Sequence, residues 1–266
     1  MAIATSCLIQ RFVIHHLKEN KMKTVLITGA NKSIGYETAK RLSKEGLFVY
    51  LGSRNLKNGE RAVEQLKSAG YENLEAIQID ITDINSIVEA KNKIEKQSGH
   101  LDVLINNAGI SGTWPQNASN ANIDDIRKTF DTNFFGTINV IQTFLSLLKK
   151  SDSPRIVNIT SGLSSLTFQS DPNWEFYAYK GASYGPSKTA LNAYTIALAY
   201  ELKDTAFKVN VVDPGFTATD FNQHRGTGKV EDAADFVAKY AVLDANGATG
   251  KFFSKEIKAE ENQSPW

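Results

Sequence analysis

Two tyrosine–lysine pairs lie close together between residues 173 and 194. Tyr177 is followed by Lys180 three positions later, and Tyr184 by Lys188 four positions later. Either spacing places an ammonium group beside a phenol on one face of a helix. A phenol with a pKa of about 10 is a weak acid–base group at neutral pH, and a neighbouring ammonium lowers that pKa by stabilising the phenolate. Such a pair is suited to exchange a proton with a carbonyl or alcohol oxygen.

The surrounding sequence distinguishes the two pairs. Tyr184 begins a convincing helical pattern, in which Ser183 is a suitable N-cap and Pro186 falls in the first turn, where its missing N–H costs little. Tyr177 instead precedes Gly181 and lies outside that pattern. We therefore predict that Tyr184 is the chemical tyrosine and that Tyr177 is a pocket-wall or packing residue.

The elements that must position these side chains alternate along the chain. Short apolar runs predict strands at 23–29, 47–53, 74–80, 101–109, 155–160, 207–215 and 250–254, and helical patterns predict helices at 34–46, 58–70, 84–99, 123–149, 184–202 and 231–243. Continuous apolar strands between helices indicate a parallel sheet covered on both faces. The prediction is a single doubly wound α/β domain of the Rossmann type, with a mostly seven-stranded parallel sheet. Ligands of such a sheet bind beyond the carboxyl ends of its strands.

Composition narrows the class of protein further. The 266 residues carry a net charge of +1, so no overall charge bias favours nucleic acid or an anionic membrane, and neither is predicted as a partner. No apolar stretch approaches the length of a membrane span. The single cysteine, Cys7, excludes an internal disulfide, no Cys/His cluster has metal-ligand spacing, and no metal is predicted. A reducing cytoplasm fits these features.

Residues 1–21 differ from the rest of the chain. Their apolar run is short and is interrupted by Arg11, and their charges are on the wrong side for a secretory signal. An upstream start or a loose extension is the favoured interpretation, and an ordered extra helix or strand is the alternative. The predicted domain is then 22–266.

A phosphate-binding turn is predicted at TGANKSIG (28–35), between the first strand and the first helix. Gly29 permits a tight turn, and Gly35 permits close approach of the helix to the strand. The start of the helix then offers free N–H groups and a partial positive charge to a pyrophosphate.

This turn and several later motifs together resemble the short-chain dehydrogenase/reductase family. The motifs occur in the family's order over roughly residues 23–253: NNAG (106–109), the Asn of NFFGT (133–137), Ser161 in IVNITSG, YGPSK (184–188) and DPGFTAT (213–219). The likeness is greatest to the NADPH-dependent carbonyl reductase branch. One position departs from the pattern, because Ser33 replaces the family's middle glycine. Its Cβ could loosen the phosphate contact, or its hydroxyl could cap the helix and donate to phosphate.

The resemblance implies four catalytic residues. Tyr184 would protonate the substrate oxygen, and Ser161 would hydrogen-bond that oxygen. Lys188 would hold the nicotinamide ribose and lower the pKa of Tyr184. Asn133 would anchor a water that links Lys188 to solvent.

The resemblance also implies a set of cofactor contacts. Beyond the turn, Asp80 and Ile81 would contact adenine, and Thr219 would reach the carboxamide after the chain turns at Pro214 and Gly215. The full predicted set is Thr28, Gly29, Asn31, Lys32, Ser33, Ile34, Gly35, Arg54, Asp80, Ile81, Asn106, Ala108, Gly109, Tyr184, Lys188, Pro214, Gly215, Thr217 and Thr219.

Two basic residues predict the choice of cofactor. An NAD enzyme usually has a carboxylate after the second strand, to bind the ribose diol. Here that position has Arg54 and no acid. In related carbonyl reductases, basic residues at the positions of Arg54 and Lys32 surround the 2′-phosphate, and the guanidinium fork matches phosphate oxygens. We therefore predict NADP(H).

The predicted activity is NADPH-dependent reduction of a ketone or aldehyde. The alternatives are an NADP-dependent secondary-alcohol dehydrogenase and a non-catalytic dinucleotide-binding sensor of the same fold. The segment between Ser161 and Tyr184 is rich in aromatic residues, namely Phe168, Trp174, Phe176, Tyr177 and Tyr179. It would form a pocket lid for apolar or aromatic substrates or cover a helix face used in assembly, which leaves monomer, homodimer and homotetramer open. By resemblance, residues of about 216–232 form the loop that closes over substrate.

Overall fold

The computed structural model describes residues 22–257 and 262–266, and its centre is a parallel sheet. Seven strands pair in the order β3-β2-β1-β4-β5-β6-β7, and every pairing is parallel. Their bounds are β1 Thr24–Ile27, β2 Phe48–Ser53, β3 Leu74–Gln78, β4 Val103–Asn106, β5 Arg155–Ile159, β6 Lys208–Asp213 and β7 Phe252–Ser254. The predicted doubly wound fold is confirmed.

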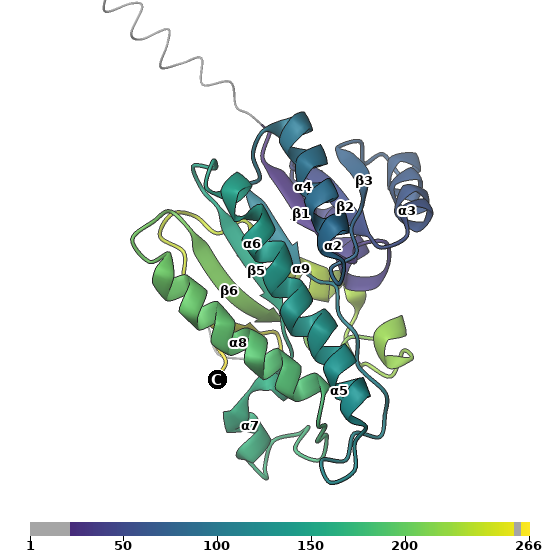
Figure 1. Cartoon of the computed structure of the whole chain (residues 1–266), viewed down its shortest axis with the longest axis vertical. Helices are drawn as coiled ribbons and strands as arrows, with labels where there is room; N and C mark the ends of the chain where they lie inside the picture. Colours follow the sequence, from purple (N-terminus) through teal and green to yellow (C-terminus); the bar gives the residue numbers. More distant parts are fainter. Residues whose placement is uncertain (1–21, 258–261) are drawn as a thin grey trace, which may run out of the picture.

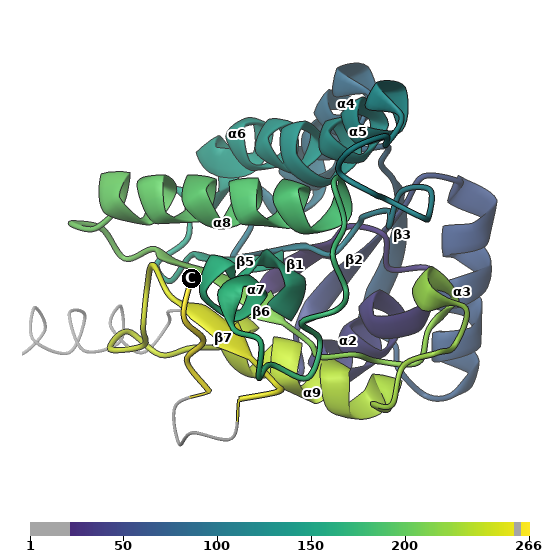
Figure 2. The same cartoon turned by 90° about the horizontal axis from the view of Figure 1, so that it is seen from below.

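Helices cover both faces of this sheet (Figure 2). One layer contains α2 (Ser33–Lys44), α3 (Leu56–Ser68) and α9 (Val230–Ala241). The other contains α4 (Ile84–Ser98), α5 (Ile123–Phe130), α6 (Thr137–Leu148) and α8 (Tyr184–Glu201). Successive strand residues point to opposite faces, so Ile27 packs in the α2 layer and Leu26 in the α6 layer. Both faces are therefore apolar, which explains the continuous apolar runs of the strands.

The predicted helix at 123–149 is interrupted. Residues Asp131–Gly136 form a π-helical turn, η1, between α5 and α6. A Cβ at Gly136 would lie only 2.7 Å from the Ile81 carbonyl oxygen, so the chain passes close to the end of β3 at this turn. Single π-helical turns inside α-helices are frequent at functional sites.

Three short elements were not predicted from the sequence. They are η2 (Gly162–Ser164), α7 (Leu166–Ser170) and η3 (Asp220–Asn222), and all three follow the carboxyl end of β5 or β6. In Figure 1 this edge of the sheet faces the lower part of the picture, where α7 lies. The loop predicted at 216–232 ends at residue 229, because α9 begins at Val230. A bridge between Thr217 and Gly228 joins the two ends of this loop. The predicted extension, 1–21, is outside the described residues.

Candidate active site

The predicted phosphate turn is fastened to the end of β4. Gly29 has a φ of +63°, and a Cβ there would lie 2.9 Å from the Ala108 Cα. A Cβ at Gly35 would lie 2.6 Å from Asn107 Nδ2, so only glycine permits these approaches. Asn107 Nδ2 donates to the carbonyl oxygens of Thr28 and Gly29, both at 3.0 Å. The Thr28 hydroxyl accepts from the backbone N–H groups of Asn107 and Ala108.

Asn107 is a site residue that the sequence prediction missed. Its neighbour Asn106 is one of the predicted cofactor contacts, but the Asn106 side chain is buried and donates to Asn158 Oδ1 at 2.8 Å. That side chain therefore belongs to the interior of the sheet. Asn106 is the last residue of β4, and the chain leaves the strand at Asn107. Because successive side chains of a strand point to opposite faces, the sequence could have indicated that Asn106 and Asn107 point in different directions.

Ser33 adopts the backbone conformation of a glycine. Its φ is +53°, in the left-handed region that is unfavourable for a residue with a Cβ. The N-cap of α2 is Lys32, without a side-chain cap, and the Ser33 hydroxyl makes no hydrogen bond within the described part of the chain. The capping role considered for this hydroxyl is therefore not observed. Asn31 and Ile34, the other predicted residues of this turn, are partly exposed.

The two predicted 2′-phosphate residues have different surroundings. Lys32 Nζ lies 3.0 Å from Asp220 Oδ2, which joins the phosphate turn to the loop after β6. The pKa of the Asp220 carboxyl is lowered, first by its bond to Lys32 and further by His224. Arg54 follows β2, is exposed, and has no ion pair or hydrogen bond among residues 22–257 and 262–266. Arg54 is thus the freer of the two cations.

The two residues predicted to contact adenine, Asp80 and Ile81, make contacts within the protein. Asp80 Oδ1 accepts from the backbone N–H of Thr82 at 3.0 Å and from its hydroxyl at 2.7 Å. The Ile81 side chain is buried in the core layer beneath α4 and α6. The Asp80 carboxylate therefore stabilises a local turn, and the Ile81 side chain is core.

Tyr184 and Ser161 meet at the carboxyl edge of the sheet. Ser161 follows β5 and Tyr184 is the first residue of α8, and the Ser161 hydroxyl is near enough to the Tyr184 phenol to affect its pKa. Burial, and then the negative charge of Asp213, raise the pKa of the Tyr184 phenol, while Ser161 lowers it to a smaller extent. The phenol is therefore protonated at neutral pH, as a general acid must be.

Lys188 lies one helical turn after Tyr184 and is buried. Its Nζ donates to the Ile159 carbonyl oxygen at 2.8 Å, and burial lowers its pKa to about 8. The ammonium form therefore still predominates at neutral pH. The expected lowering of the Tyr184 pKa by Lys188 is not seen here, since burial, Asp213 and Ser161 are the causes that act on this pKa.

Asn133 joins three segments of the site. It lies in η1 and is buried, and its Oδ1 accepts from the Ile110 N–H at 2.8 Å. Its Nδ2 donates to the Ile110 carbonyl oxygen and to the Ser187 hydroxyl of α8. A Cβ at Gly109 would lie 3.1 Å from Asn133 Oδ1 and 3.5 Å from Lys188 Nζ, so the backbone at 109 passes directly over both groups. The Asn133 side chain thus joins the segment after β4 to α8. Its role in a proton relay stays a prediction.

Gln116 holds the start of α8. Ser183 occupies the N-cap position, but its hydroxyl makes no cap and is buried without a partner among the described residues. Gln116 Oε1 instead accepts from the N–H groups of Ser183 and Tyr184, at 3.2 and 3.1 Å. Gln116 Nε2 is held by the Ser111 carbonyl oxygen at 2.7 Å. Ser183 is therefore at the predicted N-cap position, but its hydroxyl does not cap the helix, and no local sequence pattern pointed to Gln116.

The segment after β6 turns where it was expected to turn. Pro214 is buried, Gly215 has a φ of +78°, and the Thr217 hydroxyl donates to both of their carbonyl oxygens at 3.2 Å. Thr219 is also buried, and its N–H donates to Asn222 Oδ1. Both threonine side chains are thus enclosed by their own loop.

The second tyrosine–lysine pair has a different geometry. Lys180 Nζ lies 4.0 Å from the centre of the Tyr177 ring, over its face and not beside its hydroxyl group. The same Nζ donates to the carbonyl and side-chain oxygens of Gln169. The segment is not helical, so the spacing of this pair does not create an acid–base group, as predicted.

An apolar cavity of about 330 Å³ lies near the start of α8, and neither Tyr184 nor Ser161 lines it. It is lined by Gly185, which follows Tyr184, and by Leu163, two residues after Ser161. Its other lining residues are Trp114, Leu166, Gln169, Tyr179, Lys180, Gly181, Pro186 and Thr189. The ring of Phe221, from the loop after β6, lies 5.4 Å from the Tyr184 ring. Tyr179, rather than Tyr177, supplies the tyrosine wall of this cavity.

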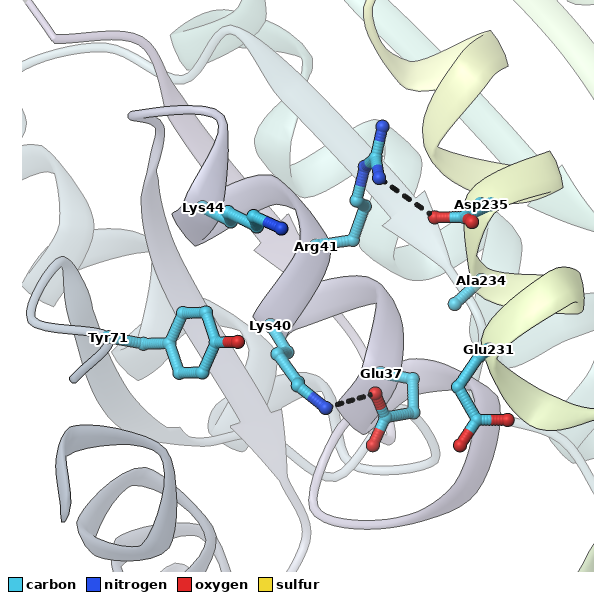
Figure 3. A pocket seen from close by; sticks show the side chains of 8 residues that line it. All are labelled: Glu37, Lys40, Arg41, Lys44, Tyr71, Glu231, Ala234 and Asp235. Atoms are coloured by element: carbon cyan, nitrogen blue, oxygen red, sulfur yellow. Dashed lines mark hydrogen bonds and ion pairs between the residues drawn. The ribbon is translucent and has the colours of Figure 1, made fainter. Parts of the chain in front are cut away.

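A second hollow lies between α2 and α9 (Figure 3). Its charged side chains pair with one another: Lys40 with Glu37 at 3.0 Å and Arg41 with Asp235 at 3.3 Å. None of the predicted catalytic or cofactor residues lines it. The first pair lies within α2, and the second joins α2 to α9.

Residues 22–257 and 262–266 contain neither a helix long and apolar enough to cross a membrane nor a group of three or more His, Cys, Asp or Glu side chains that could hold a metal ion.

Comparison with known proteins identifies the family of this chain. Residues 23–229 match the family model described as short chain dehydrogenase. The chain belongs to the short-chain dehydrogenase/reductase family, whose members are oxidoreductases.

Individual relatives cover most of the chain. Salutaridine reductase from Papaver bracteatum is 31% identical over 88% of this chain and 94% of its own length. The (+)-neomenthol dehydrogenase of Arabidopsis thaliana is 31% identical over 92% of this chain and 100% of its own. Among solved structures, carbonyl reductase from chicken fatty liver with NADPH bound has a TM-score of 0.78 at 25% identity, covering 92% of this chain and 100% of that one.

Proposed function

We propose that this chain is an NADPH-dependent reductase of ketones or aldehydes in which Tyr184 is the general acid. The observation that carries the proposal is that Tyr184 at the start of α8, Ser161 after β5 and the buried Lys188 meet at the carboxyl edge of the sheet. A phenol held neutral can donate a proton to a developing alkoxide, and a neighbouring hydroxyl can orient the same oxygen.

The residues present fit a bound dinucleotide. The glycine turn at 28–35 opens directly onto the N-terminus of α2, where free N–H groups suit a pyrophosphate. Arg54 is exposed and unpaired within the described chain, and its planar fork suits a 2′-phosphate. When bound, NADPH would supply the hydride. The NADPH in the chicken carbonyl reductase structure supports the choice of cofactor.

Each catalytic side chain then has a separate task. Ser161 holds the carbonyl oxygen, and Tyr184 transfers its proton to that oxygen. Lys188 is largely protonated at neutral pH, and its charge one turn away stabilises the phenolate that remains. Asn133 keeps α8 and the segment after β4 in register.

The substrate is proposed to be an apolar or aromatic carbonyl compound. The cavity near the start of α8 is walled by Trp114, Leu163, Leu166 and Tyr179. Its volume of about 330 Å³ is within the usual range for sites of small organic ligands, roughly 300–1,000 Å³. Reductases and dehydrogenases of small organic compounds among the relatives support this class.

A secondary-alcohol dehydrogenase is the second candidate. The (+)-neomenthol dehydrogenase relatives favour it, since their names describe the oxidative direction. The same Tyr184 would then act as a base, as phenolate, where it acts as an acid in reduction. The third candidate, a dinucleotide sensor without turnover, has no use for the Tyr184–Ser161 pair.

The test is the oxidation of NADPH against a panel of ketones, aldehydes and quinones. We expect turnover by the wild type, weaker turnover with NADH, and a loss of at least about 100-fold in kcat for Tyr184→Phe. Tyr177→Phe is the matched control, since Tyr177 contacts Lys180 through its ring face. Full activity in Tyr184→Phe would exclude Tyr184 as the acid, and tight NADPH binding without any turnover would favour the sensor.

Two further properties belong to this proposal. We place the enzyme in the cytoplasm because a single cysteine fits a reducing compartment. Monomer, homodimer and homotetramer all stay open. The exposed Ile196 and Tyr200 on α8 are the residues to examine if the chain self-associates.

A further inference from the structure

An ion pair joins the loop after β6 to the phosphate turn. Asp220 is the first residue of η3, and its Oδ2 lies 3.0 Å from Lys32 Nζ. Lys32 is the N-cap of α2, and the N-terminus of this helix is where the phosphate groups of a dinucleotide are expected. The Asp220 carboxylate is therefore an internal anion beside a site suited to an external one.

The turn around Asp220 holds this carboxylate in a defined place. The N–H groups of Asn222 and His224 donate to the Thr219 carbonyl oxygen, at 3.2 and 2.9 Å. Asn222 Nδ2 donates to the Thr217 carbonyl oxygen at 2.8 Å. His224 Nε2 lies 2.9 Å from Asp220 Oδ1, so each oxygen of the carboxylate has a partner.

The same turn extends to the catalytic tyrosine. The ring of Phe221 lies 5.4 Å from the ring of Tyr184. Gln223 and His224 have φ angles of +57° and +59°, in the left-handed region that is unfavourable for residues with a Cβ. Such a conformation persists where surrounding contacts hold it. The ion pair to the phosphate turn is one of these contacts.

Both side chains of the pair are accessible to a ligand. The Lys32 side chain is 62% exposed and the Asp220 side chain is 50% exposed. An exposed ion pair contributes little free energy, so another anion can take the place of its carboxylate. A phosphate group is a strong competitor, since it carries a charge of about −1.5 to −2 at neutral pH and three acceptor oxygens.

We propose that Asp220 is a specificity-determining residue, whose carboxylate competes with the 2′-phosphate of NADP(H) for Lys32 and so reduces the preference for NADP(H) over NAD(H). The inference rests on the proposed function, which makes Lys32 a ligand of the 2′-phosphate. Binding of that phosphate replaces the contact of Lys32 with Asp220. Lys32 therefore contributes to cofactor affinity only the difference between the two contacts.

The competition is tested by binding, without substrate or turnover. Isothermal titration calorimetry gives the Kd of NADP⁺ and of NAD⁺ for the wild type and for Asp220→Asn, which keeps the shape of the side chain without its charge. We expect Asp220→Asn to bind NADP⁺ about 2- to 5-fold more tightly, the range that an exposed ion pair allows, and NAD⁺ with less than about 1.5-fold change. An equal gain for both dinucleotides would overturn the proposal, because it would mean that Asp220 opposes the pyrophosphate that they share.

Two smaller probes isolate the phosphate in question. Adenosine 2′,5′-bisphosphate and adenosine 5′-monophosphate differ only in the 2′-phosphate. Asp220→Asn should tighten the first by the same factor of about 2 to 5 and leave the second unchanged. Equal changes for the two nucleotides would contradict competition at the 2′-phosphate.

A second background tests whether Asp220 acts through Lys32. In Lys32→Gln no ion pair remains to be broken, so adding Asp220→Asn should leave the Kd of NADP⁺ within about 1.5-fold. A gain as large as in the wild-type background would show general repulsion by the Asp220 charge and would refute competition for Lys32. Glu231→Gln is the matched control, because Glu231 is exposed, lies in the first turn of α9 directly after this loop and is not paired with Lys32. It should leave both Kd values unchanged.

The outcomes separate this inference from the proposed function. A wild type that prefers NADP⁺, with no gain in Asp220→Asn, would overturn the role of Asp220 alone. A wild type that binds NAD⁺ more tightly than NADP⁺ would refute the proposed cofactor, while the effect of Asp220→Asn on the two nucleotides would still decide the competition. Asp220→Ser removes the same charge and replaces Asp220→Asn in every comparison if the asparagine variant does not fold.

Discussion

The backbone of Ser33 adopts a conformation that favours glycine, although serine carries a Cβ. Its φ of +53° is the conformation that the glycine of related phosphate turns adopts without strain. A residue with a Cβ is destabilised there by about 1–2 kcal/mol. The resemblance to the family identified Ser33 as the residue that replaces a glycine. The structure showed that the φ angle of Ser33 is positive.

Changing Ser33 to glycine should therefore stabilise the protein. We expect Ser33→Gly to raise the free energy of unfolding by about 0.5–1 kcal/mol, since relief of strain exceeds the extra entropy of glycine in the unfolded chain. Urea unfolding measures the change. Ser43→Gly in the body of α2 is the matched control and should destabilise by about 0.5–1 kcal/mol. A loss of stability in Ser33→Gly would contradict the argument.

Arg54 should decide between the two nicotinamide cofactors more strongly than Lys32 does. Lys32 is already paired with Asp220, whereas Arg54 is exposed and unpaired within the described chain. We expect Arg54→Ala to lower kcat/KM for NADPH by about 10- to 100-fold, because a charged hydrogen bond contributes about 1.5–3 kcal/mol. The value for NADH should change little. Equal losses with both cofactors would show that Arg54 does not contact the 2′-phosphate.

At the scale of elements, α8 depends on a residue that is distant in sequence. The start of this helix carries Tyr184, and Gln116 accepts from its first N–H groups. Gly181 permits this contact, since a Cβ there would lie 2.7 Å from Gln116 Oε1. The helix itself was predicted from its period, but its cap was not, because the capping group comes from another loop.

Removing the Gln116 acceptor should disturb both stability and catalysis. We expect Gln116→Leu to lower the free energy of unfolding by about 1–3 kcal/mol, since two enclosed N–H groups lose their partner. Its kcat should fall more than its KM rises, because the start of α8 sets the position of the Tyr184 hydroxyl. Gln97→Leu on the exposed face of α4 is the control and should change stability by less than about 0.5 kcal/mol. Unchanged kcat in Gln116→Leu would contradict this positioning.

At the scale of the whole molecule, a single sheet separates two apolar layers. One layer joins strands to α2, α3 and α9, and the other joins them to α4, α6 and α8. Since adjacent strand residues contribute to opposite layers, neither layer can unfold without the other. The aromatic segment before α8 is also linked to the molecule's edge, because Trp266 accepts from Thr167 and packs near Phe252.

Unfolding of residues 22–266 should therefore be cooperative. The three tryptophans, Trp114, Trp174 and Trp266, all lie outside the helices and strands, while far-ultraviolet circular dichroism follows the helices and the sheet. We expect tryptophan fluorescence and circular dichroism to give coincident denaturation curves. An earlier fluorescence transition would mean that the catalytic edge opens before the sheet does.

The sequence by itself determined the order of strands and helices, the covering of both faces, and the choice of Tyr184 over Tyr177. These depend on local patterns: continuous apolar runs, helical periods, and motifs that occur in one order. The seven parallel strands confirmed the fold. The family motifs predicted the tetrad, although its chemistry awaits the test of Tyr184→Phe.

Only the tertiary structure decided which side chains surround that tetrad. Asn107, which was not predicted, holds the phosphate turn, Gln116 caps the start of α8 in place of the Ser183 hydroxyl, and Asp213 lies near Glu256 beside Gly162. Each contact joins residues far apart in the sequence, and its energy depends on burial and on the direction of a side chain. No local pattern encodes either quantity, because both arise when separate strands end at one edge of the sheet.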